Sequence, residues 1–237
     1  MSKQTAAKSK APAPQALIVY GGWDGHEPKL CMELVAPWME SRGFKVTIRD
    51  SLDIYADKRA MKKFSLVVPI WTMGEITQEQ REGLCNTVRA GCGLAGWHGG
   101  MCDSFRNDTE YQFMTGGQWV AHPGNIITYY VDGIDQTNPL TKGLTRFRMK
   151  SEQYYMHTDP GNKVLAWTTF SGRHGDAPWI KGTKMPVVWT RKYGKGRVFY
   201  TSLGHVAADF EVPEAFEIVK RGIQWAAGMR IRPEYQS

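Results

Sequence analysis

The sequence predicts an α/β protein in which helices cover both faces of one mostly parallel sheet. Through the first hundred residues, short apolar runs alternate with amphipathic helical segments. Strands that alternate with helices pair in parallel, because each helix returns the chain to the edge where the previous strand began. The composition, 42% hydrophobic and 22% charged, is that of a globular protein, and 237 residues are enough to bury one large core.

Four short segments predict the parallel strands of this first part. Residues 16–22 (ALIVYGG) and 64–71 (FSLVVPIW) are apolar runs typical of strands buried on both faces. Residues 44–50 (FKVTIRD) alternate in polarity, as a strand does when one face is buried. Residues 92–100 (CGLAGWHGG) form a fourth strand and a glycine-rich turn. We expect the fully apolar segment 64–71 near the centre of the sheet.

Two amphipathic segments predict the crossover helices. The first spans residues 28–43, and Gly43 is its expected terminator. The second spans residues 77–91, where Thr77 can cap the first turn and Gly91 ends the helix. The buried face expected of the first helix contains Leu30, Leu34, Val35, Trp38 and Met39.

The second half of the chain is less regular but continues the same domain. A closing amphipathic helix spans residues 213–228. We expect one α/β domain over 16–230, followed by a C-terminal tail at 231–237, because no linker or internal repeat divides the chain. Its predicted strands are 125–132, 163–170, 185–193 and 196–204, with the turn YGKG joining the last two.

Positive charge is concentrated near the N-terminus. The net charge is +7, and Lys3, Lys8 and Lys10 place three of these charges in residues 1–15, a basic segment that we expect to be disordered. The remaining charge is not clustered, so nucleic acid is not an expected partner. No apolar stretch has the length of a signal peptide core or a membrane span, so no membrane partner is expected.

The four cysteines, Cys31, Cys85, Cys92 and Cys102, favour a reducing compartment. No two of them have C-x-x-C spacing, which argues against a thiolate zinc knuckle and against a disulfide framework. We therefore expect a cytoplasmic protein with free thiols.

Polar side chains follow several predicted strands directly. His26 comes after 16–22, His98 stands in the turn of the fourth strand, and His205 follows the last strand. Glu152 opens the polar segment that continues through Tyr154. Ligands of open parallel sheets bind at the carboxyl ends of the strands. We expect His26, His98, Glu152 and His205 to meet at this edge.

Two chemistries fit these residues. His26, His98, Glu152 and His205 can hold a divalent metal, zinc or manganese, with an open position for water or a carbonyl oxygen. Without metal, His98, Glu152 and His205 can serve as acid and base catalysts. Catalysis by a cysteine fits less well, because Cys102 lies beyond the sharp corner of the turn. No phosphate-binding or dinucleotide fingerprint is present, so no nucleotide cofactor is expected.

Five blocks in order carry a resemblance to a known family. They are ALIVYGGWDGHEP, GLAGWHGG, GGQWVAHPG, SEQYYMHTDP and PVVWTRKYGKGRVFYTSLGH. Together they resemble the trehalose-utilisation (ThuA-like) family, whose fold is similar to that of class I glutamine amidotransferases, a flavodoxin-like three-layer sandwich. In those amidotransferases the fourth-strand elbow carries a cysteine, whereas this sequence has His98 at the corner. The resemblance therefore implies that glutamine hydrolysis is absent.

The resemblance implies a role in carbohydrate metabolism. Family context points to 3-keto sugars, with elimination or hydrolysis of a 3-keto-glycoside, epimerisation or isomerisation as the reactions. A ketone acidifies the neighbouring C–H bond, so a histidine or glutamate base can remove that proton. The substrate contacts expected around this chemistry are Trp23, His26, Trp97, Trp119 and Tyr154.

A second interpretation stays open. Subunits of this fold that have lost the nucleophile can be non-catalytic modules, and the tryptophan-rich site would then bind a sugar or a partner chain. A module of that kind has no reason to hold stoichiometric metal, so metal content separates the two interpretations. A homodimer is the assembly to expect for a soluble enzyme of this size.

Overall fold

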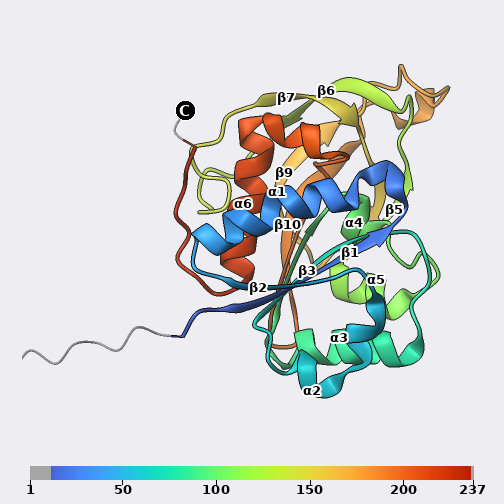
Figure 1. Ribbon diagram of the computed structural model, residues 1–237. Helices are drawn as coiled ribbons and strands as arrows, with labels where there is room; N and C mark the ends of the chain where they lie inside the picture. Colours follow the sequence, from blue (N-terminus) through green and yellow to red (C-terminus); the bar gives the residue numbers. More distant parts are fainter. Residues whose placement is uncertain (1–11, 236–237) are drawn as a thin grey trace, which may run out of the picture.

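The computed structural model describes residues 12–235. Its central element is a nine-stranded sheet (Figure 1). Its strands are β1 (Gln15–Gly22), β2 (Lys45–Arg49), β3 (Leu66–Thr72), β4 (Gly93–Trp97), β6 (Ile126–Asp132), β7 (Phe147–Glu152), β9 (Lys163–Thr169), β10 (Lys184–Tyr193) and β11 (Gly196–Thr201). They lie in the order β2-β1-β3-β4-β11-β10-β9-β6-β7. A separate pair, β5 (Gly117–Ala121) and β8 (Tyr155–Thr158), forms a small antiparallel ribbon.

The large sheet has a parallel half and an antiparallel half. Strands β2, β1, β3, β4 and β11 are parallel neighbours, and each strand from β11 through β10, β9, β6 to β7 is antiparallel to the one before it. This succession turns β7 into the same direction as β11. The carboxyl end of β7 therefore lies at the same edge of the sheet as the ends of β1, β4 and β11.

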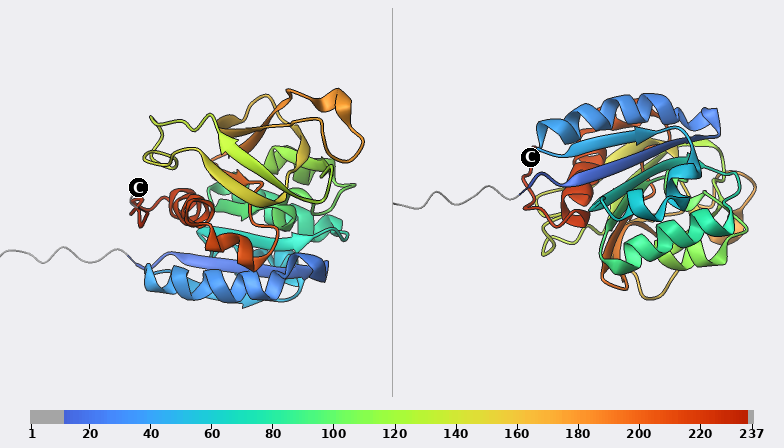
Figure 2. Two further views of the ribbon diagram at one scale, coloured as in Figure 1. Left: turned by 90° about the horizontal axis from the view of Figure 1, so that it is seen from above. Right: turned by 60° about the horizontal axis from the view of Figure 1, so that its bottom comes forward.

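Helices cover both faces of the sheet, as the sequence predicts (Figure 2). Helices α1 (Pro28–Ser41) and α6 (Pro213–Ala226) lie on one face, and α3 (Gln78–Ala90) and α5 (Thr109–Thr115) lie on the other. Alternate residues of β1 enter the two cores: Ile18 packs with the first pair and Leu17 with the second. The shorter helices are α2 (Lys58–Met61), α4 (Gly99–Cys102) and the 3-10 turns η1 (Asp24–His26), η2 (Leu52–Ala56), η3 (Pro178–Ile180) and η4 (Ala207–Glu211).

The predicted caps of α3 are confirmed, whereas the buried face predicted for α1 is only partly correct. Thr77 and Gln80 form a reciprocal capping box at the start of α3, and Gly91 ends that helix at φ 131°. The face predicted for α1 is wrong in part, because Leu30 and Leu34 point to solvent. Val35 and Met39 are buried as predicted, and the other side chains that α1 buries are Pro28, Cys31, Met32 and Ala36.

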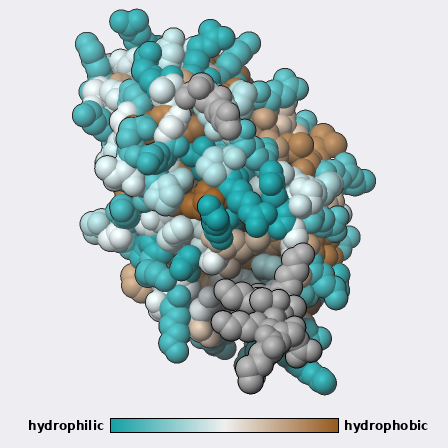
Figure 3. Space-filling model, turned by 90° about the vertical axis from the view of Figure 1, so that its left-hand side faces the viewer, coloured by the Kyte–Doolittle hydropathy of each residue, from teal (hydrophilic) through white to brown (hydrophobic). Residues whose placement is uncertain are grey.

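The described part of the chain begins and ends near the amino edge of the parallel strands (Figure 1). Figure 3 views this edge, whose surface is mostly hydrophilic with small scattered apolar patches. Lys3, Lys8 and Lys10 of the predicted basic tail lie outside the described residues. The segment predicted as a C-terminal tail is fixed to the domain through Glu234, which accepts hydrogen bonds from the Trp38 indole (2.7 Å) and the Lys220 ammonium (2.6 Å).

Two other expectations concern cysteines and membranes. All four cysteines are buried and unpaired, as their spacing predicts. Within residues 12–235, no helix combines the length and apolar character needed to cross a bilayer.

Candidate histidine–carboxylate site

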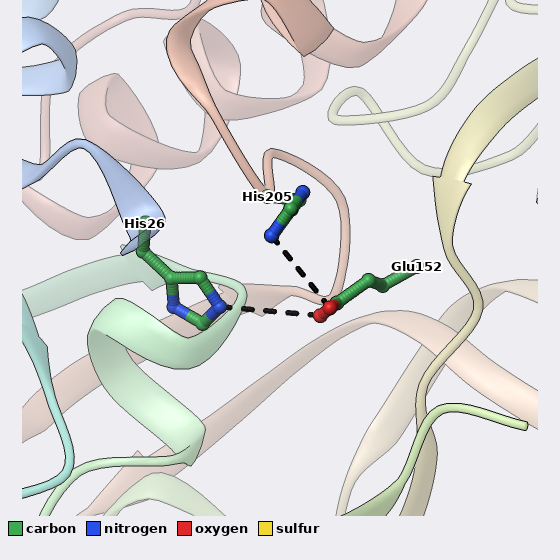
Figure 4. A group of neighbouring side chains, drawn as sticks. All are labelled: His26, Glu152 and His205. Carbon is green, nitrogen blue, oxygen red and sulfur yellow. Dashed lines mark ion pairs between the residues drawn. The ribbon is translucent and has the colours of Figure 1, made fainter. Parts of the chain in front are cut away.

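Four histidine side chains surround the carboxylate of Glu152. Its Oε2 atom lies 3.5 Å from Nε2 of His98 and 3.9 Å from Nε2 of His26. Its Oε1 atom lies 3.6 Å from Nε2 of His205 and 3.7 Å from Nε2 of His122. Figure 4 shows His26 and His205 reaching the carboxylate from separate segments of the chain.

These five residues come together because each lies at or near the end of a strand, four at the large sheet and one at the small ribbon. His26 lies in η1 after β1, His98 follows β4, and His205 follows β11. Glu152 is the last residue of β7, and His122 directly follows β5 of the small ribbon. Since β7 runs parallel to β11, its last side chain reaches the edge where the histidines of the parallel half stand. The predicted meeting of His26, His98, Glu152 and His205 at one edge is what the structure contains.

His98 occupies a sharp elbow between β4 and α4. Its backbone has φ 43° and ψ −142°, a region that costs a non-glycine residue about 1–3 kcal/mol. Two hydrogen bonds hold the strained corner. The His98 N–H donates to the Thr201 carbonyl (2.7 Å), and the Tyr200 hydroxyl donates to the His98 carbonyl (3.1 Å). The elbow thus presents an imidazole at the turn position where nucleophilic enzymes of similar architecture have a serine or cysteine.

Hydrogen bonds to Nδ1 orient two of the rings. Nδ1 of His26 lies 2.9 Å from the Thr72 hydroxyl oxygen, and Nδ1 of His98 lies 3.0 Å from the Tyr154 hydroxyl oxygen. In both rings Nε2 is the atom left facing Glu152. A partner on the far nitrogen fixes the orientation of a metal-binding histidine in many proteins.

A buried carboxylate, Asp209, connects the loop after β11 with the end of β7. Its Oδ2 atom accepts the backbone N–H of His205 (2.9 Å) and the hydroxyl of Ser151 (2.5 Å). Ser151 immediately precedes Glu152 in β7. Asp209 therefore fixes the backbone of His205 relative to β7, the strand that carries Glu152.

Burial changes the pKa values at the centre of the site. It lowers the pKa of His26 to about 3, and the neighbouring side chains His205, His122 and Arg106 add to this effect. Burial likewise lowers the pKa of His98 well below 6.5. It raises the pKa of Glu152 above 4.5, although His205 and His122 oppose the shift. The neutral form of His26 and His98, which is the form of an imidazole that binds metal, is thus favoured at neutral pH.

The distances around Glu152 suit a shared ion better than direct hydrogen bonds. The four separations of 3.5–3.9 Å exceed the usual hydrogen-bond range. Ligand atoms about 2.0–2.2 Å from a tetrahedral zinc lie about 3.3–3.6 Å from one another. Nε2 of His98 and Oε2 of Glu152 are buried without a hydrogen-bond partner, and His26, Glu152 and His205 offer ligand atoms within 4.8 Å of one another. The donor set therefore fits a divalent metal.

His122 is the one member of the site that the sequence pattern does not predict. It was visible only as part of a glycine-rich loop, GGQWVAHPG. The pairing of β5 with β8 carries this loop to Glu152, because Trp119 of β5 lies opposite Met156, close behind Tyr154. A ribbon between segments so far apart leaves no local pattern in the sequence.

The predicted substrate contacts occupy different places. Trp23 is 46% exposed and its ring meets that of His26 at 4.8 Å, and Trp119 lies 5.5 Å from the His122 ring. Tyr154 is buried and stacks on His98. Trp97, in contrast, is buried in the core against Phe210. Its expected role as a stacking surface is a misassignment, because the side chain has no free face to offer a sugar.

Fold and site together define an α/β sandwich with a histidine–carboxylate centre at the carboxyl edge of its sheet. Residues 15–226 match the family described as trehalose utilisation, ThuA. This match covers most of the chain, so the protein belongs to the trehalose-utilisation family, which has a carbohydrate-related role. The family resemblance of the sequence is thereby confirmed.

Solved structures share this fold. A putative ThuA-like protein from Parabacteroides merdae is 20% identical, with a TM-score of 0.71 over 95% of this chain and 94% of that one. One from Bacteroides uniformis is 18% identical, with a TM-score of 0.70 over 94% and 98%. A β-galactosidase from Bacillus circulans is 14% identical, with a TM-score of 0.53 over 92% of this chain and 31% of its own. At these identities the likeness concerns the fold alone. No curated protein matches the sequence.

Proposed function

We propose that this protein is a metal-dependent enzyme that acts on a keto-sugar, such as a 3-keto-glycoside, at the centre around Glu152. The observation that carries the proposal is the convergence of four imidazole Nε2 atoms on one buried carboxylate at 3.5–3.9 Å. Membership of a carbohydrate-related family supports a sugar as the substrate. Histidine and carboxylate donors suit zinc or manganese.

His26, Glu152 and His205 are the residues that would hold the ion, since their ligand atoms all lie within 4.8 Å of one another. A bound divalent cation supplies Lewis-acid chemistry, which polarises a carbonyl or acidifies a water. This assignment leaves Nε2 of His98 and Nε2 of His122 beside the same carboxylate. Both atoms face this carboxylate: His122 is half-buried and open to solvent on one side, whereas a substrate reaches the buried His98 only through movement of the side chains around it.

The side chains outside the ligand group can move the protons of keto-sugar chemistry. A neutral His98, with its pKa lowered by burial, is in the form that accepts a proton from the carbon next to the ketone. The electron pair of that C–H bond passes into the carbonyl as an enolate. When the enolate returns its electrons, the glycosidic C–O bond breaks and the leaving oxygen takes a proton. His122, half-buried at the edge of the site, is placed to donate that proton.

Metal analysis tests the proposal most directly. Untagged wild-type protein should contain about one equivalent of zinc or manganese, and His26→Ala and His205→Ala should lose it. His98→Ala should keep most of the metal but lose turnover of a 3-keto-glycoside. His157→Ala is the matched control, because this histidine is exposed on β8 away from Glu152.

Each part of the proposal has its own contradicting outcome. Wild-type protein that stays metal-free when offered zinc and manganese contradicts the metal site. Loaded protein that leaves every keto-sugar unchanged contradicts the activity and favours the sugar-binding module.

A further inference from the structure

A hollow of about 560 Å³ opens beside the site. One wall is the segment from Trp119 to Asn125, which includes the end of β5 and the loop after it. The other walls are Tyr155 of β8 and the loop from Gly175 to Ile180. This loop and the β5 ribbon lie side by side at the right of Figure 1. None of the steps proposed above uses this hollow.

The side chains that line the hollow are mostly apolar. The polar side-chain groups among them are those of His122 and Asn125, the Tyr155 hydroxyl and the indole N–H groups of the two tryptophans. A second sugar ring would bring several hydroxyl groups into a space with few side-chain partners, which is costly. An aromatic or aliphatic group would meet complementary surface instead. The walls therefore favour an aromatic or aliphatic group over a second sugar, which has more hydroxyl groups to satisfy.

Trp179 marks the open side of the hollow. It is 78% exposed, more than any other large hydrophobic side chain in the described residues. It lies in η3, on a loop that lines the hollow together with Trp119. The two tryptophans give the hollow aromatic, apolar surface against which a planar group can pack.

His122 joins the hollow to the histidine–carboxylate centre. Its Nε2 atom lies 3.7 Å from Glu152 Oε1, while the same side chain lines the hollow. Its ring is nearly parallel to that of Tyr154, at 6.3 Å and 24°. When the sugar of a ligand lies at Glu152, the group attached to that sugar therefore extends into the hollow.

We propose that this hollow is a subsite for an aromatic aglycone, so that the substrate class is an aryl glycoside rather than a disaccharide. The position of the sugar rests on the proposed function. The affinity of the hollow for an aromatic group does not, because it depends on the apolar walls and on Trp179. Binding without turnover is therefore the decisive measurement.

Isothermal titration with matched ligands tests the subsite. The probes are phenyl β-glucopyranoside, methyl β-glucopyranoside and cellobiose, each titrated into the full chain. Burial of the phenyl ring should make wild-type protein bind the phenyl glycoside about tenfold more tightly than the methyl glycoside. Trp179→Ala should reduce this preference to about threefold or less. Phe113→Ala is the matched control, because Phe113 is also exposed, at 59%, but does not line the hollow.

Three results would overturn the subsite. Equal affinity for the phenyl and methyl glycosides is the first, and tighter binding of cellobiose than of the phenyl glycoside is the second. No detectable binding of the phenyl glycoside at about 10 mM, a concentration that reveals interactions of about −3 kcal/mol, is the third. The His205→Ala variant separates this inference from the proposed function. A phenyl preference that survives in this variant supports the subsite even if metal and turnover are absent.

Discussion

The carboxylate of Asp209 accepts the backbone N–H of His205 at 2.9 Å, and the same oxygen accepts the hydroxyl of Ser151 at 2.5 Å. This one buried atom fixes the spacing between the loop after β11 and the end of strand β7. Since His205 and Glu152 stand on these two segments, Asp209 acts as a positioning residue for both. Burial raises its pKa, against the hydrogen bonds that favour the charged form.

The Asp209→Ala change should loosen this spacing. We expect zinc affinity to fall about 10–100-fold, as it does when outer partners of metal ligands are removed. Zinc titration against a competing chelator measures the loss, and circular dichroism checks that the fold persists. Asp209→Asn keeps one acceptor oxygen and should recover part of the affinity. A variant without the carboxylate that binds zinc as tightly as wild type would show that Asp209 is only structural.

Tyr154→Phe should destabilise the protein and reorient His98. The change removes the hydroxyl that lies 3.0 Å from Nδ1 of a fully buried ring, which leaves that nitrogen without its partner. The expected loss is about 1–3 kcal/mol in the free energy of unfolding. Denaturant unfolding measures it, with Tyr130→Phe as the control, since Tyr130 is 41% exposed. Equal losses in the two variants would argue against the Tyr154–His98 interaction.

The first half of the fold and most of the site were predictable because their signals are local. The apolar runs of β1, β3 and β4 identify buried strands, and the residue after each strand identifies the edge of the sheet. The elbow was visible from glycines around His98. These features depend on side-chain periodicity and on turns, both of which are written in adjacent residues.

The second half of the fold and the position of His122 depend on pairings between segments that are distant in the sequence. Strand β7 has no strong apolar pattern, and its direction is fixed only by the antiparallel succession from β11 through β6. The β5–β8 ribbon brings His122 to Glu152 in the same non-local way. The exposed Leu30 on α1 shows a different limit, since neighbouring positions of an apolar-rich helix compete to face the core.

Acid should destabilise the chelator-treated protein between pH 6.5 and about 3. Burial lowers the folded-state pKa of His26 to about 3, so in this window the unfolded chain binds a proton that the folded chain does not. Stability from this group is present above pH 6.5 and is lost as pH falls, by at most about 1.4 kcal/mol per pH unit. His98 acts in the same direction. Glu152, whose folded pKa is raised, acts in the opposite direction just above pH 4.5.

Denaturant unfolding across this range measures the slope. His26→Gln should flatten it, because glutamine has no proton to gain, whereas His157→Gln, an exposed control, should leave it unchanged. An unchanged slope in the His26 variant would mean that the buried imidazole is not the group that titrates.

Gly99→Ala should damage the site through a steric effect alone. A Cβ atom at this position would lie 2.4 Å from Cε1 and 2.5 Å from Nδ1 of His26, and 3.0 Å from the Tyr154 hydroxyl. The His26 ring would have to turn away and give up its hydrogen bond to Thr72, at a cost of about 1–3 kcal/mol. Zinc affinity should fall together with the free energy of unfolding. Gly161→Ala is the control, because its Cβ would approach only the Asp159 side chain, at 3.0 Å, on an exposed turn. If Gly99→Ala binds zinc normally, the ring of His26 has more room than this packing allows and is not the ligand that the distances indicate.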